Sequence, residues 1–520
     1  MSAPLLLAID AGTGSCRSVL FDADGHQLAV CQREWDHHEL PDAPGSQVFD
    51  TERNWTLICA TLTEALDRAG ISGQGVTAVT ATSMREGMVL FDAAGRELWA
   101  CPNVDSRGGE EAAELVRSGA AEDIYRQAGD WVAITAPARF RWIARHEPEV
   151  FAQIARVGML GDWVLTKLSG CFATDASLGS SSGMFDLAER RWSSEIVELC
   201  GLDPVVFPRV EEPGTVVGEV TAAAAVETGL RQGTPVVAGG ADTQLALLGI
   251  GVAQPGRCTV VGGSFWQHTA LLDEPLIDPE ARLRTLCHAV PGQWMIEGIG
   301  FWSGLVMRWF RDGFCEAEKE LAQANGADVY ALLERRAAEV PPGSHGVLAL
   351  FSNLMAASRW VHGPPAFMQF DVCNPERSGK RECVRAIEEG AAYVSRGHLE
   401  IIAEVTGIEI DEVLFTGGAA KGELWPQILA DVLGVPVRLP VVKESTALGA
   451  ALLAGVGAGV YRDAMEAAAL VSRFGRDVEP DPEAHAAYQR LYGEWREVYA
   501  RAKAISDDGL LRPLWRAAGA

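Results

Sequence analysis

The sequence predicts an α/β fold made of two similar halves, each built on a mixed sheet. Short apolar segments rich in Val, Ile and Leu alternate with longer segments of helical periodicity, which is typical of this fold class. At 520 residues the chain is too long for one hydrophobic core. A weak internal repeat supports the two halves, because Leu5–Ile9 runs into a glycine turn and Cys258–Phe265 repeats this pattern about 250 residues later.

The N-terminal half opens with a predicted strand meander followed by a helix and a buried strand. Apolar and β-branched residues predict these elements. The strands are Leu5–Ile9, Arg17–Phe21 and Gln27–Val30, the amphipathic helix is Trp55–Ala69, and the buried strand is Val76–Thr82.

The middle of the chain is predicted to be helical, with helices at about Ala112–Arg126 and Ala138–Leu168. An apolar strand, Thr234–Gly239, then runs into Gly240-Ala241-Asp242. Glycine and proline interrupt Gly249–Arg257, which predicts a hinge between domains of residues 1–250 and 251–520.

The C-terminal half contains another strand, turn and helix. Glu412–Thr416 is a predicted strand, residues 417–422 form a glycine-rich turn, and Leu424–Leu433 is a predicted helix. Backbone amides at the start of that helix are placed to face a phosphate or a flat ring, although ordinary βα packing explains the same pattern.

Charge and cysteine usage exclude several classes of protein. The chain has 44 basic and 70 acidic side chains and a formal charge of −26, which disfavours nucleic acid and anionic membranes as partners. The eleven cysteines stand singly, without zinc-like spacing, as expected of a reduced cytoplasmic protein. No membrane-targeting segment is expected.

The turn after the first strand has the composition of a loop that holds a metal-bound triphosphate. Its glycines let the main chain approach an anion, its hydroxyl residues donate hydrogen bonds, and its arginine adds positive charge. These residues are Gly12, Thr13, Gly14, Ser15 and Arg17. Asp10 ends the strand, where it is placed to hold Mg²⁺ through water. An ordinary hairpin turn explains the same residues.

Asp242 is the candidate general base, because it stands rigidly at the end of an apolar strand. Its alternative role is that of a helix N-cap before Thr243–Leu248. The chain has no G-x-x-x-x-G-K-[ST] loop, so it is not a P-loop enzyme.

The order of these motifs resembles the FGGY carbohydrate kinase family over nearly the whole chain. The matching stretches are Asp10–Ser15, Ser83–Gly87, Trp99–Arg107, Gly240–Gln244, Val261–Ser264, Gly417-Gly418 with Ala430-Asp431, and Glu444–Gly449. The resemblance implies two actin-like ATPase (ribonuclease H-like) domains with a central cleft that closes about the hinge.

The resemblance implies that the γ-phosphoryl group of ATP is transferred to a primary hydroxyl, with Asp242 as base and Mg²⁺ held by Asp10 and Asp242. The implied substrate contacts are Arg85, Glu86, Asp105, Asp242 and Trp266. For Asp105 a structural role is an equal alternative, as core packing is for Trp266. The implied nucleotide contacts are the five loop residues above together with Gly262, Gly263, Ser264, Gly304, Arg308, Gly417, Gly418, Ala419 and Gly422.

Two positions depart from the pattern of several related kinases. Ala419 replaces a glycine, and Gly422 replaces an asparagine, in the turn expected to face adenosine.

Within the family, the chain resembles most the members that phosphorylate the quorum-sensing signal derived from 4,5-dihydroxypentane-2,3-dione. Alternative acceptors are a pentulose, gluconate or another polyol. A nucleotide-dependent regulatory module of the same fold is the alternative from a different class. The resemblance also names the phosphocarrier protein HPr as a candidate partner, and it leaves the oligomeric state open, with a homodimer as one alternative.

Overall fold

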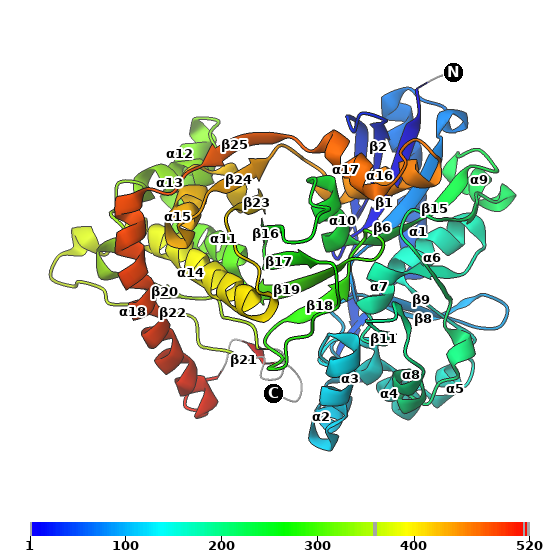
Figure 1. The fold of residues 1–520 in the computed structure, drawn as a ribbon, viewed down its shortest axis with the longest axis horizontal. Coiled ribbons are helices and arrows are strands. Elements are labelled where there is room, and N and C mark those ends of the chain that lie inside the picture. Colours follow the sequence, from blue (N-terminus) through cyan, green and yellow to red (C-terminus); the bar gives the residue numbers. More distant parts are fainter. Residues whose placement is uncertain (1–2, 357–360, 513–514, 517–520) are drawn as a thin grey trace.

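The computed structural model describes residues 3–356, 361–512 and 515–516. Two sheet-based halves lie side by side (Figure 1), with the N-terminal half coloured blue to green and most of the C-terminal part coloured yellow to red. The predicted α/β class with mixed sheets is confirmed. In the described parts of the chain, no helix is both long and apolar enough to cross a membrane.

The first sheet has six strands in the order β14-β15-β6-β1-β2-β3. Their bounds are Leu5–Ala11 for β1, Ser15–Asp22 for β2, Gln27–Glu34 for β3, Ala78–Ser83 for β6, Val216–Glu219 for β14 and Pro235–Ala241 for β15. β6 runs parallel to both β1 and β15, whereas β1, β2 and β3 form an antiparallel meander. The meander predicted from the sequence is confirmed.

The second sheet repeats this plan. Its order is β18-β19-β17-β16-β23-β24-β25. The bounds are Cys258–Gly262 for β16, Trp266–Leu272 for β17, Arg284–Cys287 for β18, Trp294–Gly300 for β19, Val413–Gly417 for β23, Val437–Pro440 for β24 and Phe474–Val478 for β25. β16, β17 and β19 form the antiparallel meander, and β23 lies parallel to β16 as β6 does to β1. The repeat inferred from the two glycine turns is therefore confirmed.

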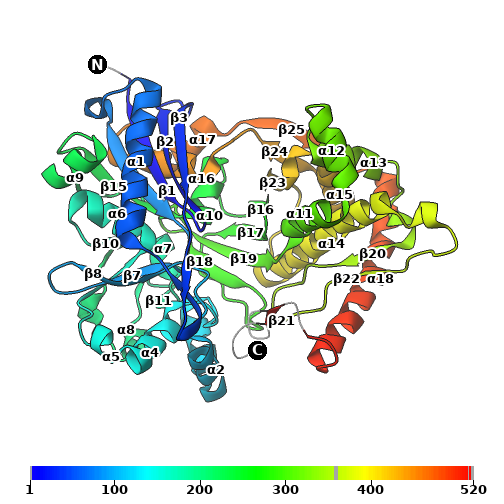
Figure 2. The ribbon, with the colours of Figure 1, turned by 180° about the vertical axis from the view of Figure 1, so that it is seen from behind.

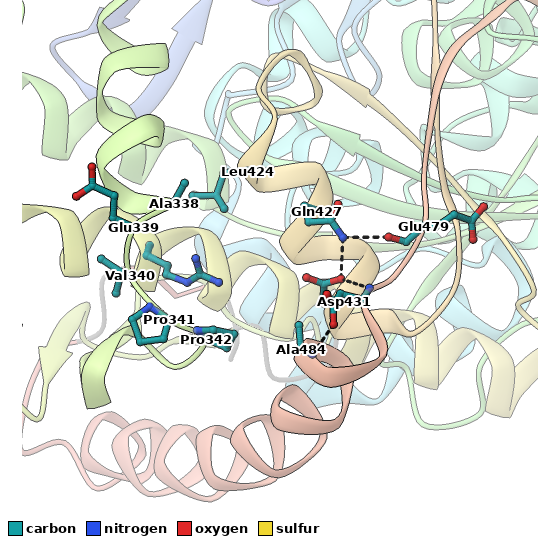
Figure 3. Close-up of a pocket in the computed structure, with 12 residues that line it drawn as sticks. Ala338, Glu339, Val340, Pro341, Pro342, Leu424, Gln427, Asp431, Glu479 and Ala484 are labelled. Carbon is teal, nitrogen blue, oxygen red and sulfur yellow. Dashed lines mark hydrogen bonds between the residues drawn. The ribbon is translucent and has the colours of Figure 1, made fainter.

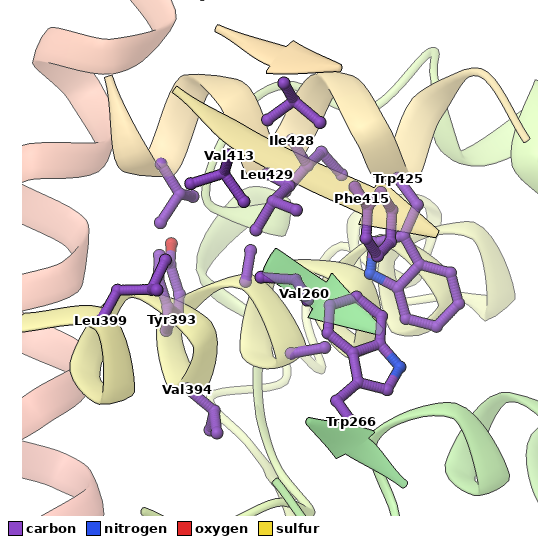
Figure 4. Packing of buried hydrophobic residues seen from close by; sticks show 14 of the residues in the cluster. Val260, Trp266, Tyr393, Val394, Leu399, Val413, Phe415, Trp425, Ile428 and Leu429 are labelled. Atoms are coloured by element: carbon purple, nitrogen blue, oxygen red, sulfur yellow. The ribbon is translucent and has the colours of Figure 1, made fainter. Parts of the chain in front are cut away.

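Helices cover the faces of both sheets (Figure 2). Among these helices are α1 (Thr51–Ala69), α6 (Leu160–Ser169), α7 (Ala176–Ser180), α10 (Asp242–Gly249), α11 (Ser303–Phe314), α13 (Val329–Ala337), α14 (Lys380–Thr406), α15 (Leu424–Leu433), α16 (Ser445–Gly457), α17 (Ala464–Val471) and α18 (Pro482–Asp507). In the second half, apolar side chains of the sheet, α14 and α15 interlock in one core, in which Trp266 packs against Phe415 and Trp425 (Figure 4).

The helices α16 and α17 come from the C-terminal part of the chain but pack with the N-terminal half (Figure 1). Gly249 of α10 and Gly449 of α16 allow the two helices to approach closely. An added Cβ would lie 2.0 Å from the Ser445 carbonyl oxygen at the first glycine and 1.9 Å from that of Leu245 at the second. The chain therefore crosses between the halves again after the predicted 249–257 hinge.

The middle of the chain differs from the two long helices that were predicted. The first is divided at Gly119, which adopts a left-handed conformation with φ of 81° between α2 (Gly109–Ser118) and α3 (Ala120–Ala128). The second is divided into α4 (Ala136–His146), α5 (Pro148–Phe151), a strand and α6. The strand β9 (Arg156–Met159) pairs with β7 (Met88–Phe91), so a tertiary contact overrides the local helical pattern.

Candidate active site

The carboxyl ends of the central strands bring the predicted acidic residues together. Ala11 of β1 and Ala241 of β15 both pair with Ser83 of β6. Asp10 and Asp242 adjoin these paired residues, so they lie at the same edge of the first sheet. Their carboxylates are close enough for Asp242 to raise the pKa of Asp10.

Asp242 presents one free carboxylate oxygen at this edge. It is the first residue of α10, and Ala241 holds the N-cap position, so the N-cap alternative does not describe it. Its Oδ1 accepts a hydrogen bond of 2.7 Å from the Thr243 amide, while Oδ2 accepts none from the described residues. The side chain is 34% exposed, and Arg85 Nε lies 4.0 Å away. Burial raises the pKa of Asp242, and Arg85 opposes that shift.

The negative charge in and around Asp10 exceeds the positive charge that Arg17 supplies. It is buried, and burial, Asp242 and Glu444 raise its pKa to about 7 against the lowering effect of Arg17. Arg17 lies 3.7 Å from Asp10 and 3.3 Å from Glu444. Clustered carboxylates at a strand end are the oxygen ligands that a divalent cation prefers, so this edge fits Mg²⁺.

The first glycine turn forms a tight hairpin beside Asp10. The Gly12 amide donates to the Ser15 carbonyl oxygen over 3.0 Å, and the Thr13 hydroxyl donates to Asn103 Oδ1. Thr13 and Gly14 are exposed at the tip. The turn therefore offers the open backbone that the sequence analysis expected of a phosphate-binding loop.

Arg85 and Glu86 belong to a buried network of charges that joins the two halves. Arg85 Nη1 donates to Glu297 Oε1 over 3.0 Å, and Arg284 Nε donates to the same oxygen over 2.8 Å. Arg284 Nη1 also donates to Glu86 Oε1 over 2.9 Å and to Asp130 Oδ2 over 3.2 Å. Burial raises the pKa of Asp130 to about 6, whereas Arg85 and Arg284 lower that of Glu297 against the effect of its burial.

Arg284, Glu297 and Asp130 were missed by the sequence analysis. Arg284 lies on β18 and Glu297 on β19, about 200 residues from Arg85 in the chain, and neither belongs to a recognisable motif. Glu86 itself has a φ of 61°, an unusual value for a residue other than glycine. Such strained residues cluster at functional sites.

Asp105 braces a loop, which is the alternative role considered for it, and its substrate contact stays a prediction. Its side chain is fully buried, accepts a 2.7 Å hydrogen bond from the Gln47 amide and pairs with Arg107 at 2.7 Å. Arg107 in turn lies against the rings of Trp99 and Trp142. These partners hold Oδ2 of Asp105, whereas Oδ1 is buried and has no hydrogen-bond partner among the described residues.

Trp266 takes the core-packing role that was its alternative. Its side chain is fully buried against Phe415 and Trp425, so it supports the sheet from within, and its contact with a substrate stays a prediction (Figure 4). The predicted pocket wall of aromatic side chains is therefore a core feature at this position.

A cavity of about 580 Å³ brings together most of the predicted nucleotide contacts of the second half. The predicted residues that line it are Gly262, Gly263, Ser264, Gly304, Arg308, Gly418, Ala419 and Gly422. Gly417 does not line it, but its φ of 96° shapes the turn. The cavity size suits a nucleoside, and main-chain amides at glycine turns suit phosphate.

A second cavity, of about 600 Å³, lies between the loop after α13, α15 and the start of α18. There Gln427 Nε2 donates to Asp431 Oδ1 and to the Glu479 carbonyl oxygen (Figure 3). Asp431 Oδ1 also accepts from the Asp481 amide over 2.7 Å. These polar groups satisfy one another, so Asp431 ties α18 to α15.

Replacing Gly304 with alanine is expected to weaken ADP binding about tenfold or more. The new Cβ would lie 1.9 Å from the Gly263 carbonyl oxygen, so α11 or the second glycine turn must move. Isothermal calorimetry measures the affinity. Gly313→Ala is the matched control on the same helix, because nothing lies within 4 Å of its added Cβ. Equal ADP affinities for the two variants would contradict the assignment of this turn.

Comparison with known proteins identifies relatives over the full length of the chain. The model of the FGGY family of carbohydrate kinases, N-terminal domain, matches residues 5–249, and the C-terminal domain model matches residues 260–458. An autoinducer-2 kinase from Yersinia enterocolitica is 45% identical over 100% of this chain and 98% of its own. One from Salmonella typhimurium is 43% identical over 99% of this chain and 97% of its own.

Solved structures share the fold. A xylulose kinase from Rhodospirillum rubrum has a TM-score of 0.84 at 28% identity, covering 96% of this chain and 98% of its own. A gluconate kinase from Lactobacillus acidophilus has a TM-score of 0.86 at 19% identity, covering 97% and 99%. The predicted pair of actin-like domains is confirmed by this likeness.

Proposed function

The chain belongs to the FGGY family of carbohydrate kinases, and on that premise we propose that it phosphorylates the quorum-sensing signal autoinducer-2 in the open form of 4,5-dihydroxypentane-2,3-dione. Family membership makes it an ATP-dependent kinase with an alcohol acceptor. The observation that carries the choice of acceptor is the 43–45% identity, over the whole chain, to relatives named autoinducer-2 kinase.

In the proposed mechanism, Asp242 accepts the proton of the primary hydroxyl on its free oxygen Oδ2. The hydroxyl oxygen bonds to the γ-phosphorus of ATP, the bond from that phosphorus to the bridging oxygen breaks, and ADP leaves. Arg85 holds the Asp242 carboxylate from 4.0 Å, and Glu297 fixes the orientation of Arg85. Arg85 and Glu86 also position the hydroxyl groups of the acceptor.

The nucleotide is proposed to span the two glycine turns. The first turn and Arg17 bind phosphate from one half, while the Gly262–Ser264 turn, α11 and the adenosine turn bind from the other. Asp10 and Asp242 hold Mg²⁺, which when bound spreads the negative charge of the phosphate oxygens. Closure of the halves about the hinge excludes water from the transferred group.

Incubation of the chain with 4,5-dihydroxypentane-2,3-dione, ATP and Mg²⁺ tests the acceptor. Mass spectrometry should detect a singly phosphorylated product. Xylulose, gluconate and glycerol run in parallel, and a product from one of these alone would replace the proposed acceptor. ATP consumption that is independent of every acceptor would favour the regulatory module instead.

Replacing Asp10 with alanine is expected to raise the Mg²⁺ concentration needed for half-maximal activity by about 10–100-fold. The size follows the usual effect of removing an outer ligand that orients a metal site. A magnesium titration at saturating ATP measures it. Asp36→Ala, an exposed change beyond β3, is the control. An unaltered magnesium response in Asp10→Ala would remove this residue from the metal site.

A cytoplasmic location is supported by eleven cysteines that form no disulfide. Binding of HPr stays a prediction, which co-purification with HPr tests. The oligomeric state stays open, and light scattering decides whether a homodimer forms.

A further inference from the structure

The proposed nucleotide cavity is lined by three acidic side chains, Asp328, Glu334 and Glu388, and also by Arg308 and Lys421. Two of the acids, Glu334 of α13 and Glu388 of α14, form an acidic pair beside the apolar side chains of Leu333, Val384 and Trp425. Carboxylates repel phosphate, so this part of the cavity does not suit the triphosphate. The apolar neighbours suit the faces of a flat ring. The acidic pair therefore lies where the base of the nucleotide belongs.

Glu334 occupies the space left by the absence of a side chain at residue 422. A Cβ added at Gly422 would lie 2.0 Å from Glu334 Oε1. Glu334 Oε2 is held there by a 3.2 Å hydrogen bond from the Glu423 amide at the start of α15. Gly422 is one of the two departures from the pattern of related kinases, and the structure shows that a carboxylate from another helix fills its place.

Glu388 is an acid without a partner. Its side chain is 0% exposed, and neither carboxyl oxygen has a hydrogen-bond partner among the described residues. Burial, together with nearby Glu334, raises the pKa of Glu388 well above its usual range, which favours the protonated carboxyl. A protonated carboxyl offers one donor and one acceptor. Leaving such a group unsatisfied is costly, which indicates that whatever fills the cavity supplies its partner.

We propose that Glu334 and Glu388 recognise the exocyclic amino group of adenine and so select ATP among nucleotides. The amino group carries two hydrogens, one for an oxygen of each acid. The Glu388 hydroxyl then donates to the adjacent ring nitrogen, which accepts. Guanine and hypoxanthine present a carbonyl oxygen at this position, which cannot donate to either acid. This inference rests on the proposed use of ATP and goes beyond it by naming the residues that read the base.

Equilibrium binding tests the pair without any acceptor or turnover. Calorimetry compares ADP with purine riboside 5′-diphosphate, which lacks the amino group, and with IDP. The unmodified chain should prefer ADP over both. In Glu388→Leu this preference should fall about tenfold or more, because a hydrogen bond of this kind contributes about 1.5 kcal/mol. Glu334→Ala should lower it in the same direction.

Two controls separate recognition from structural damage. Glu388→Gln keeps a donor and an acceptor in the same shape, so it should retain the preference for ADP. Glu404→Leu lies on the same helix, is exposed and should change nothing. Urea unfolding should show that Glu388→Leu is folded, because leucine removes an unpaired buried acid.

The outcomes distinguish this inference from the function on which it rests. A chain that binds no adenine nucleotide would overturn both. A chain that binds ADP, with the same preference in Glu388→Leu and Glu334→Ala as in the unmodified protein, would overturn the recognition of the base by these two acids and leave the kinase assignment intact.

Discussion

Replacing Asp242 with asparagine is expected to lower kcat by about 10²–10⁴-fold, which is the usual contribution of a positioned general base. The amide keeps the shape and the hydrogen bond from the Thr243 amide, so α10 should begin as before. What it loses is the ability of Oδ2 to take a proton. Steady-state kinetics with the phosphorylated product as readout measures the effect.

Nucleotide binding separates loss of chemistry from loss of the site. ADP affinity and the urea midpoint of Asp242→Asn should stay close to those of the unmodified protein, because the proposed nucleotide cavity lies in the second half. Asp24→Asn, an exposed change in the β2–β3 turn, should leave all three quantities unchanged. A turnover rate of Asp242→Asn within threefold of normal would show that another group accepts the proton.

The sequence predicts the parts of this site that local patterns encode. Apolar runs followed by Asp10 or Asp242 indicate strands that end in a carboxylate, and parallel pairing then brings both ends to one edge. The glycine turn after β23 is recognisable for the same reason, since Gly417 has a φ of 96°, which favours glycine. The repeat of this pattern at Cys258–Phe265 extends the prediction to the second half.

Features that depend on long-range contacts could not be predicted from the sequence. Arg284 pairs with Glu86, which is 198 residues away in the sequence, and no local sequence pattern indicates that partner. Asp105 stands in a family-like stretch, yet its burial and its ion pair with Arg107 show that it braces a loop, and the burial of Trp266 shows that it packs in the core. The strand β9 arises only because β7 is available to pair with it. In each case the tertiary environment determines the role.

The charge network joins the two halves beside the proposed substrate region. Arg284 and Glu297 belong to the second sheet, whereas Arg85, Glu86 and Asp130 belong to the first half. All five side chains are nearly excluded from water, so removing the partner of any one of them would cost folding free energy. The network therefore links the position of β18 to the orientation of Arg85 beside the proposed base.

Replacing Arg284 with methionine is expected to lower the free energy of unfolding by about 3–5 kcal/mol at pH 8, because breaking a buried ion pair leaves uncompensated charge. Arg284 contacts Glu86, Asp130 and Glu297, and its side chain is only 2% exposed. Methionine fills much of the volume, so the lost charge dominates. Urea unfolding followed by circular dichroism measures the change.

The pH dependence identifies the cause of that loss. The pKa of Asp130 is raised to about 6 even with Arg284 present, and removing the cation raises it further. A carboxyl whose folded pKa exceeds its unfolded value destabilises the fold as pH rises through that range, so the variant should recover stability from pH 8 to pH 6. Adding Asp130→Asn should restore part of the loss at pH 8. A loss that is equal at both pH values and unaffected by Asp130→Asn would instead indicate a packing defect, and the electrostatic link between the halves would be wrong.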